Sequence, residues 1–363
     1  MYDLKTLSVP DADRNRILQY VTISAMRKAI SIFVLLLAAL PAAAAEGLRI
    51  YFVDVEGGQA TLIVSPAGQS MLVDAGWPSK FGPGGADRIA AVAKLAGIKQ
   101  IDYMFLTHYH LDHVGGVPEL AAEIPIVTFV DHGPNTETDI MARGLEAAYK
   151  QVVAKAKHVV VKPGDRIPIQ GLDVEVVEAA GAPITAPLEG SGENNDACAG
   201  VKPLAADPTE NGQSAGFILR YGKFRFADFG DLTWNKELAL VCPKNLLGTV
   251  DVFLVSHHGM DISNSPALVD ALHPRVAVMN NGAKKGGSPK AWDVVRNAPG
   301  LEDLWQLHYA LGGGEAHNSP ETYIANPEKG GACQGHWLEL TAEADGSFTV
   351  VNERNGFTKR YRR

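Results

Sequence analysis

Three imidazoles and a carboxylate occur in one short segment of this chain, at His108, His110, Asp112 and His113, and the glycines 115–116 follow them. Neutral imidazole and carboxylate donors together suit zinc, with manganese or iron as the alternatives. The two glycines let a helix pack closely against a neighbouring strand. The segment therefore predicts a site for one or two metal ions rather than a histidine-rich surface turn.

The elements around this segment explain how it could position its donors. The apolar run Ile101–Leu106 predicts a buried strand, so the polar cluster lies at a strand end, where layered α/β folds build their sites. On an extended segment His108 and His110 project the same way, whereas Asp112 and His113 fall on the first turn of a helix. One pair could hold one ion and the other pair a second.

The pattern His-x-His-x-Asp-His at residues 108–113 resembles the signature of the metallo-β-lactamase fold. That resemblance implies an α/β protein with α+β layering, a four-layer αββα sandwich whose members mostly use one or two metal ions for hydrolysis. Further segments resemble the branch that includes the hydrolase-like domain of competence-type DNA-uptake proteins, at residues 51–60, 72–76, 229–232 and 255–259. The similarity runs from about Leu48 to about Met279. It leaves the substrate open, because this fold hosts lactonases, thioesterases, nucleases, phosphodiesterases and β-lactamases.

The resemblance places further ligands after later strands. Asp231 would bridge two ions so that they share one water, and its alternative role is a helix N-cap. Of two adjacent histidines, the resemblance favours His258 as the ligand and leaves His257 as a nearby residue or proton carrier. Asp112 would bind the second ion and orient the nucleophile, a metal-bound hydroxide that attacks an ester-like centre.

The third histidine of the family's first site is missing. It usually precedes the strand before the Gly-Asp pair, which corresponds here to residues 210–214, and no histidine is there. Competence-type relatives commonly lack it as well. His132, at the end of another predicted strand, could take its place, or it could be a turn histidine that caps Gly133. In the second case the first site has two imidazoles and Asp231, and it either binds metal weakly or completes its ligand set with solvent.

The expected function is a secreted metal-dependent hydrolase for a small-molecule or phosphoester substrate. Lys284 and Lys285 suit a phosphate as point charges, although a solvated loop is the alternative. The resemblance to DNA-uptake proteins favours a phosphodiester or phosphoester over a lactone, carboxylic ester or β-lactam, and a catalytically weak binding module is a second alternative. A net charge of −8 argues against nonspecific binding of nucleic acid.

Residues 26–45 have the pattern of a secretory signal peptide, with a basic start, a short apolar stretch and an alanine-rich exit. The apolar run is too short to span a bilayer, so no stable membrane anchor is expected after processing; an N-terminal anchor is the alternative. We interpret residues 1–25 as an extension from a start codon placed too early, and residues 46–363 as a single metallo-β-lactamase-like domain. The expected location is the periplasm or the cell exterior. One pair among Cys198, Cys242 and Cys333 could form a disulfide there.

Alternating strand and helix patterns predict two sheets with helices between the strands in sequence. Strands are expected at residues 48–55, 60–64, 70–73, 101–106, 124–130, 158–161, 172–177, 215–220, 223–228, 250–255 and 276–279, and helices at 86–96, from 114 onward and at 139–155. Short glycine-containing turns imply that the first three strands are antiparallel, and residues 335–340 and 347–352 form a plausible hairpin. Residues 179–212 lack periodicity and predict a lid or a disordered insert. His308, a lone histidine, is expected at the surface or in the core, with a substrate contact as the alternative.

Overall fold

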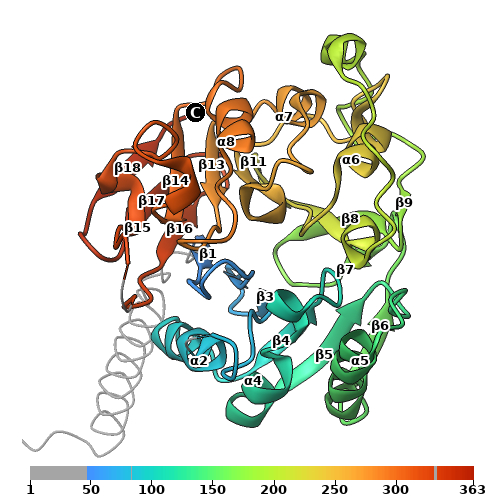
Figure 1. Cartoon of the computed structure of the whole chain (residues 1–363), viewed down its shortest axis with the longest axis vertical. Coiled ribbons are helices and arrows are strands. Elements are labelled where there is room, and N and C mark those ends of the chain that lie inside the picture. Colours follow the sequence, from blue (N-terminus) through green and yellow to red (C-terminus); the bar gives the residue numbers. More distant parts are fainter. Residues whose placement is uncertain (1–46, 83, 331–332) are drawn as a thin grey trace, which may run out of the picture. The chain divides into compact units, whose positions relative to one another are not determined.

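The computed structural model describes residues 47–82, 84–330 and 333–363, in which two β-sheets lie face to face (Figure 1). The expected signal peptide and the extension before it lie outside the described residues. Within the described ranges, no helix has the length and apolar character needed to cross a membrane.

The first sheet has nine strands in the order β18-β17-β16-β1-β2-β3-β4-β5-β6. They are β1 (Leu48–Phe52), β2 (Thr61–Val64), β3 (Ser70–Val73), β4 (Ile101–Phe105), β5 (Ile126–Asp131), β6 (Lys157–Val160), β16 (Leu338–Ala342), β17 (Phe348–Asn352) and β18 (Thr358–Tyr361). The strands β1 to β3 are antiparallel and the expected hairpin of β16 and β17 forms, so both predictions are confirmed. The strands β3 to β6 are parallel.

The second sheet also has nine strands, in the order β15-β14-β13-β12-β11-β10-β8-β7, and β9 pairs with β8. They are β7 (Arg166–Ile167), β8 (Asp173–Ala179), β9 (Ala182–Pro183), β10 (Gly216–Tyr221), β11 (Phe224–Asp228), β12 (Val252–Leu254), β13 (Val276–Met279), β14 (Asp303–His308) and β15 (Ile324–Asn326). The pairs from β11 to β15 are all parallel, so the carboxyl ends of these strands share one edge.

Helices cover the outer face of each sheet, and this completes four layers (Figure 1). The first sheet packs against α2 (Gly85–Leu95), α4 (Val117–Glu123) and α5 (Ile140–Val153), and the second against α6 (Trp234–Val241), α7 (Pro266–Leu272) and α8 (Pro289–Arg296). A third apolar cluster, which includes Phe105 and Phe226, fills the space between the sheets. The expected αββα sandwich is confirmed. The helix expected from residue 114 onward is instead two short helices, α3 (Leu111–Val114) and α4.

The segment without periodicity, residues 179–212, is packed against the second sheet. Its side chains Ile184 and Leu188 are buried. A disulfide joins Cys198 to Cys242 at the end of α6, which leaves Cys333 as the free thiol of the chain. The disordered alternative is therefore wrong, because apolar contacts and a covalent link hold the segment in place.

Candidate metal centre

The histidine motif follows β4 and enters α3 through a tight contact with the preceding chain. A Cβ atom on Gly116 would lie 2.1 Å from the carbonyl oxygen of Ala75, and one on Gly115 would lie 2.4 Å from Cδ of Pro78. Larger residues would push α3 away from the loop after β3, so the glycines fix where the motif's side chains point.

Four of the predicted ligands converge at the strand ends of both sheets. The donor atoms of Asp112, His113, Asp231 and His258 all lie within 4.8 Å of one another. Asp112 and His113 belong to α3, whereas Asp231 follows β11 and His258 follows β12. The Nε2 atom of His258 lies 3.2 Å from Oδ2 of Asp112 and 3.3 Å from Oδ1 of Asp231. All four side chains are buried.

Asp231 occupies the centre of the histidine cluster rather than a helix cap. Helix α6 has Thr233 as its N-cap residue, so the helix-cap alternative does not apply. One oxygen of Asp231, Oδ2, lies 3.3 Å from Nε2 of both His113 and His257 and 3.9 Å from Nε2 of His108. Its other oxygen, Oδ1, lies 3.3 Å from Nε2 of His258 but accepts no hydrogen bond from the described residues, although it is buried. A buried carboxylate oxygen without such a partner fits a metal ligand.

The adjacent residues His257 and His258 both point into the site because the backbone turns unusually there. Their φ angles are 52° and 54°, in the left-handed region that side chains other than glycine rarely adopt. Such backbone strain concentrates at functional sites. Of the two, His258 belongs to the four-donor group, and His257 reaches Asp231 with Nε2 and Ser263 Oγ with Nδ1, at 3.3 Å each.

His108 and His110 form a second pair of imidazoles beside the four-donor group. Nε2 of His108 lies 3.1 Å from Nδ1 of His110, and Nε2 of His110 lies 3.1 Å from Oε1 of Glu137. The side chains of His110 and Glu137 are 28 % and 25 % exposed, so this end of the cluster reaches solvent. Sequence reasoning missed Glu137, which lies in the loop before α5 and has no motif around it.

His132 takes part in a different contact. Its Nε2 lies 3.0 Å from Oε2 of Glu210, and its ring packs edge-on against Tyr109. The other oxygen of Glu210 accepts hydrogen bonds from the backbone nitrogen and hydroxyl of Thr136. No contact in the described part of the chain joins His132 to the other proposed ligands. Glu210 lies where the family's third histidine was sought, and it anchors the loop that carries Glu137.

A buried carboxylate behind the site orients His113. Oδ2 of Asp74 lies 2.7 Å from Nδ1 of His113 and accepts the hydroxyl hydrogen of Thr107 at 2.7 Å, while Oδ1 accepts the Thr107 backbone N–H at 2.8 Å. This contact leaves Nε2 of His113 directed at the cluster. Such a carboxylate–imidazole pair fixes the ring and makes the ligand more basic.

The electrostatics of the cluster favour ionised carboxylates. Burial opposes charge at His113, but the neighbouring carboxylates, led by Asp231 and Asp112, hold its pKa well above the usual value. The pKa values of Asp112 and Asp231 are well below their usual range despite burial, chiefly because of His113. Burial and the proximity of His113 lower the pKa of His108. The site therefore presents anionic oxygens toward a point shared by several imidazoles.

The two lysines proposed for substrate binding are placed differently. The ammonium of Lys285 contacts Oδ2 of Asp112 and lies 5.3 Å from the centre of the Trp77 ring, and its side chain is 31 % exposed. Lys284 is exposed and forms no ion pair with the described residues. The loop that carries both is fixed to the site, because the Gly287 N–H donates to the carbonyl oxygen of His258.

Residues 53–193 match the model of the Metallo-beta-lactamase superfamily. No curated protein matches the sequence. Over these residues the chain is similar to this superfamily, whose members are metal-dependent hydrolases, the enzyme class that the sequence predicts. The match does not distinguish the competence-protein branch within it.

Similar solved structures have low sequence identity to this chain. The metallo-beta-lactamase fold protein YhfI from Bacillus subtilis is 10 % identical with a TM-score of 0.43, over 72 % of this chain and 96 % of that one. CmlA, a diiron beta-hydroxylase from Streptomyces venezuelae, is 16 % identical with a TM-score of 0.40, over 71 % of this chain and 48 % of that one. MEM-A1, a subclass B3 metallo-beta-lactamase from a soil metagenome library, is 16 % identical with a TM-score of 0.36, over 70 % of this chain and 81 % of that one.

Proposed function

We propose that this chain hydrolyses a phosphodiester or another phosphoester, and that it works in the periplasm or outside the cell. The observation that supports the chemistry is the convergence of Asp112, His113, Asp231 and His258, with donor atoms within 4.8 Å of one another. We assign zinc to this site, because its donors are imidazole nitrogens and carboxylate oxygens, with manganese or iron as alternatives. When bound, the ions supply an activated water and a Lewis acid.

The residues of the site divide the remaining tasks. Asp231 lies near His108 on one side and near His113 and His258 on the other. We therefore assign it as the residue that would bind both ions. Asp112 would hold one ion, and its carboxylate would orient the water. His257 has one ring nitrogen toward Asp231 and the other toward Ser263, so it is placed to carry a proton between the site and the surrounding polar groups.

The first site, to which His108 and His110 belong, has the weaker set of ligands. His108 and His110 supply two nitrogens, and the nearest further oxygen belongs to Glu137, 3.1 Å from Nε2 of His110. We propose Glu137 in place of His132 as the third ligand, because His132 is engaged by Glu210. His110 and Glu137 are partly exposed, and a carboxylate stands in place of the family's histidine. We therefore expect this site to bind its metal ion more weakly than the other site.

Lys285 is the observation that favours a phosphoester over a carboxylic ester. Its ammonium lies beside Asp112, and its side chain is partly open to solvent. The ammonium can therefore form an ion pair with a phosphate oxygen that is not bound to a metal ion. A simple lactone has no comparable anionic oxygen in its ground state. The resemblance to the competence-protein branch supports the same choice.

Two features support the proposed export. Residues 26–45 have the pattern of a signal peptide, and the disulfide Cys198–Cys242 fits an oxidising compartment. The proposal of export is therefore independent of which ester the protein hydrolyses.

Parallel assays with a bis-aryl phosphodiester and a simple lactone test the substrate class, with zinc or manganese added to the purified protein. We expect phosphodiester turnover that Asp112→Asn abolishes. Lactone or β-lactam hydrolysis without phosphodiester turnover would overturn the substrate class and leave the metal site standing. A protein that binds metal but hydrolyses neither ester type would support the binding-module alternative.

A further inference from the structure

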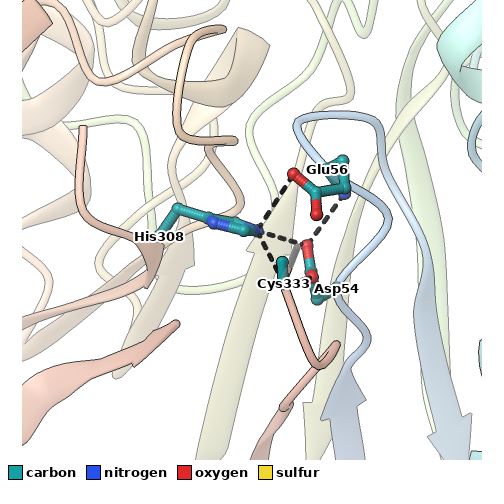
Figure 2. Close-up of side chains that lie close together, drawn as sticks. All are labelled: Asp54, Glu56, His308 and Cys333. Carbon is teal, nitrogen blue, oxygen red and sulfur yellow. Dashed lines mark hydrogen bonds and ion pairs between the residues drawn. The ribbon is translucent and has the colours of Figure 1, made fainter. Parts of the chain in front are cut away.

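A second group of donor side chains includes two residues of the loop that follows β1. Asp54 and Glu56 come from this loop, His308 ends β14, and Cys333 precedes β16. Their four donor atoms all lie within 4.8 Å of one another. Figure 2 shows the imidazole of His308 directed at both carboxylates and at the thiol.

One ring nitrogen of His308 faces the other three donors. Its Nε2 lies 2.7 Å from Oδ1 of Asp54, 3.8 Å from Oε2 of Glu56 and 3.9 Å from Sγ of Cys333. The thiol in turn lies 3.0 Å from Oδ2 of Asp54. Asp54 and His308 are buried, while the Glu56 side chain is 25 % exposed, so the group has one side through which a ligand can enter.

This group does not have the arrangement of a nucleophilic cysteine. In a Cys-His-Asp triad the carboxylate binds the ring nitrogen opposite the one that activates the thiol. Here Asp54 and Cys333 both face Nε2 of His308.

We propose that Asp54, Glu56, His308 and Cys333 form a structural binding site for a zinc-like divalent ion, separate from the histidine-motif centre. Thiolate, imidazole and carboxylate are the three ligand types that zinc takes from proteins, and around tetrahedral zinc their donor atoms are about 3.3–3.8 Å apart. The separation of Nε2 and Sγ, 3.9 Å, is already near this range. The two shorter contacts, from Asp54 to His308 and from Asp54 to Cys333, are hydrogen bonds. Metal binding would replace the protons of these hydrogen bonds with the ion.

Arg88 supports the group from outside. Its Nη1 donates to Oδ2 of Asp54 at 2.6 Å and to the Asp54 carbonyl oxygen at 3.2 Å, and its Nη2 donates to the carbonyl oxygen of Cys333 at 3.3 Å. Once the thiol and imidazole have released their protons, three anionic donors and one guanidinium leave an excess negative charge that one divalent ion neutralises. Carboxylates that bind a metal are themselves held by outer hydrogen-bond partners, and Arg88 has this place on Asp54.

An ion here would stabilise the loop that supports the histidine motif. Gln59 N–H donates to the carbonyl oxygen of Asp112 at 3.1 Å, and a Cβ on Gly58 would lie 2.4 Å from the same oxygen. The loop is therefore in close contact with α3 a few residues after Asp54 and Glu56. The role we assign is to hold this loop, the end of β14 and the segment before β16 together.

Cobalt substitution tests the site because a sulfur-to-cobalt charge-transfer band requires a thiolate ligand. Cys198 and Cys242 are bonded to each other, and the histidine-motif centre contains no sulfur, so the band reports Cys333 alone. In the full chain with its metals exchanged for cobalt, we expect the near-ultraviolet band at one equivalent, and its loss in Cys333→Ser.

Two further variants make the result specific. His308→Gln should lose the band, whereas Asp231→Ala should lose metal from the histidine-motif centre and keep the band. Absence of the band in the cobalt-saturated wild-type chain would overturn the proposal and leave Asp54, His308 and Cys333 as a hydrogen-bonded network. A band that persists in Cys333→Ser would overturn it as well. The wild-type measurement needs no variant to fold.

Discussion

The Nε2 atoms of His113 and His258 lie 3.2 Å apart, although 145 positions separate the two residues in the sequence. Both nitrogens also lie 3.2 Å from the same oxygen, Oδ2 of Asp112. Asp74 holds the other side of the His113 ring, so its free nitrogen is committed to the cluster. Two imidazole nitrogens that face each other beside shared carboxylates are the arrangement expected around a common ion.

The first prediction concerns the ligands themselves. Asp231→Ala should lose at least one equivalent of metal with little change in far-ultraviolet circular dichroism, because Asp231 contacts both histidine groups. His132→Ala is the matched control and should keep its metal, since its imidazole is paired with Glu210. Metal analysis of the purified variants checks both. Loss of one equivalent in His132→Ala would restore that histidine as a ligand.

The second prediction concerns the orientation of His113. Asp74→Asn keeps the size of the side chain and tolerates the φ of 58° at this position, but it removes the carboxylate charge behind the imidazole. We expect metal affinity to fall by about 10- to 100-fold, as for other outer partners of ligating histidines. Competition with a chromophoric chelator measures it. Unchanged affinity would mean that packing alone orients the ring.

The third prediction separates the two lysines. Lys285→Ala should raise the Michaelis constant for a phosphodiester by roughly tenfold and change kcat little, because a contact made in both ground and transition states gives uniform binding. Lys284→Ala should have little effect, because Lys284 is exposed and unpaired among the described residues. If the two substitutions raise the Michaelis constant equally, the lysines act only through the overall positive charge of the loop and the prediction is wrong. The metal content of both variants serves as the control.

The fourth prediction concerns Glu178, a buried residue of β8 whose carboxylate oxygens form no hydrogen bond with the described residues. Burial raises its pKa from 4.5 to about 8. The stability that its protonated form contributes is fully present below pH 4.5 and is lost as the pH rises to about 8. Glu178→Gln cannot ionise, so its stability relative to wild type should improve by about 2–4 kcal/mol between pH 5 and pH 8. Urea unfolding at both pH values checks this, and a constant difference would contradict it.

The fifth prediction concerns export. If residues 26–45 are a signal peptide, the exported protein should begin at or within a few residues of Glu46, and a chain that starts at Met26 should be exported as well as the full one. Mass spectrometry of the exported protein decides the point. Residues before Met26 in the mature product would contradict the proposed start site.

The sequence predicted the parts of this molecule that local pattern determines. The strands β3 and β13 have the predicted bounds, and most others differ by one to three residues at their ends. The strands β7, β9, β14, β15 and β18 were not predicted. The strands β7 and β9 have only two residues each, which is too short for a periodic pattern. In β14 nearly every residue is buried, polar and apolar alike, so hydrophobicity does not alternate along the strand.

The candidate site shows the same division. Residues within a motif, such as Asp112 and His113, could be proposed as ligands from their spacing, and their donor atoms lie close to those of Asp231 and His258. Glu137 and Glu210 could not, because a lone glutamate in a loop carries no spacing and its importance depends on what the fold places beside it. The same holds for His308 and Cys333, which contribute to a group whose other members lie more than two hundred positions away.

The pairing of β1 with β16 has a consequence for how the protein can be divided. The matched region, residues 53–193, contains neither β1 nor the three C-terminal strands that continue the first sheet beyond it. A fragment cut at those limits would expose the backbone of β2 at an open sheet edge, so we expect it to aggregate. The first sheet is also incomplete until β16, β17 and β18, which follow the whole second sheet in the sequence, have paired beyond β1.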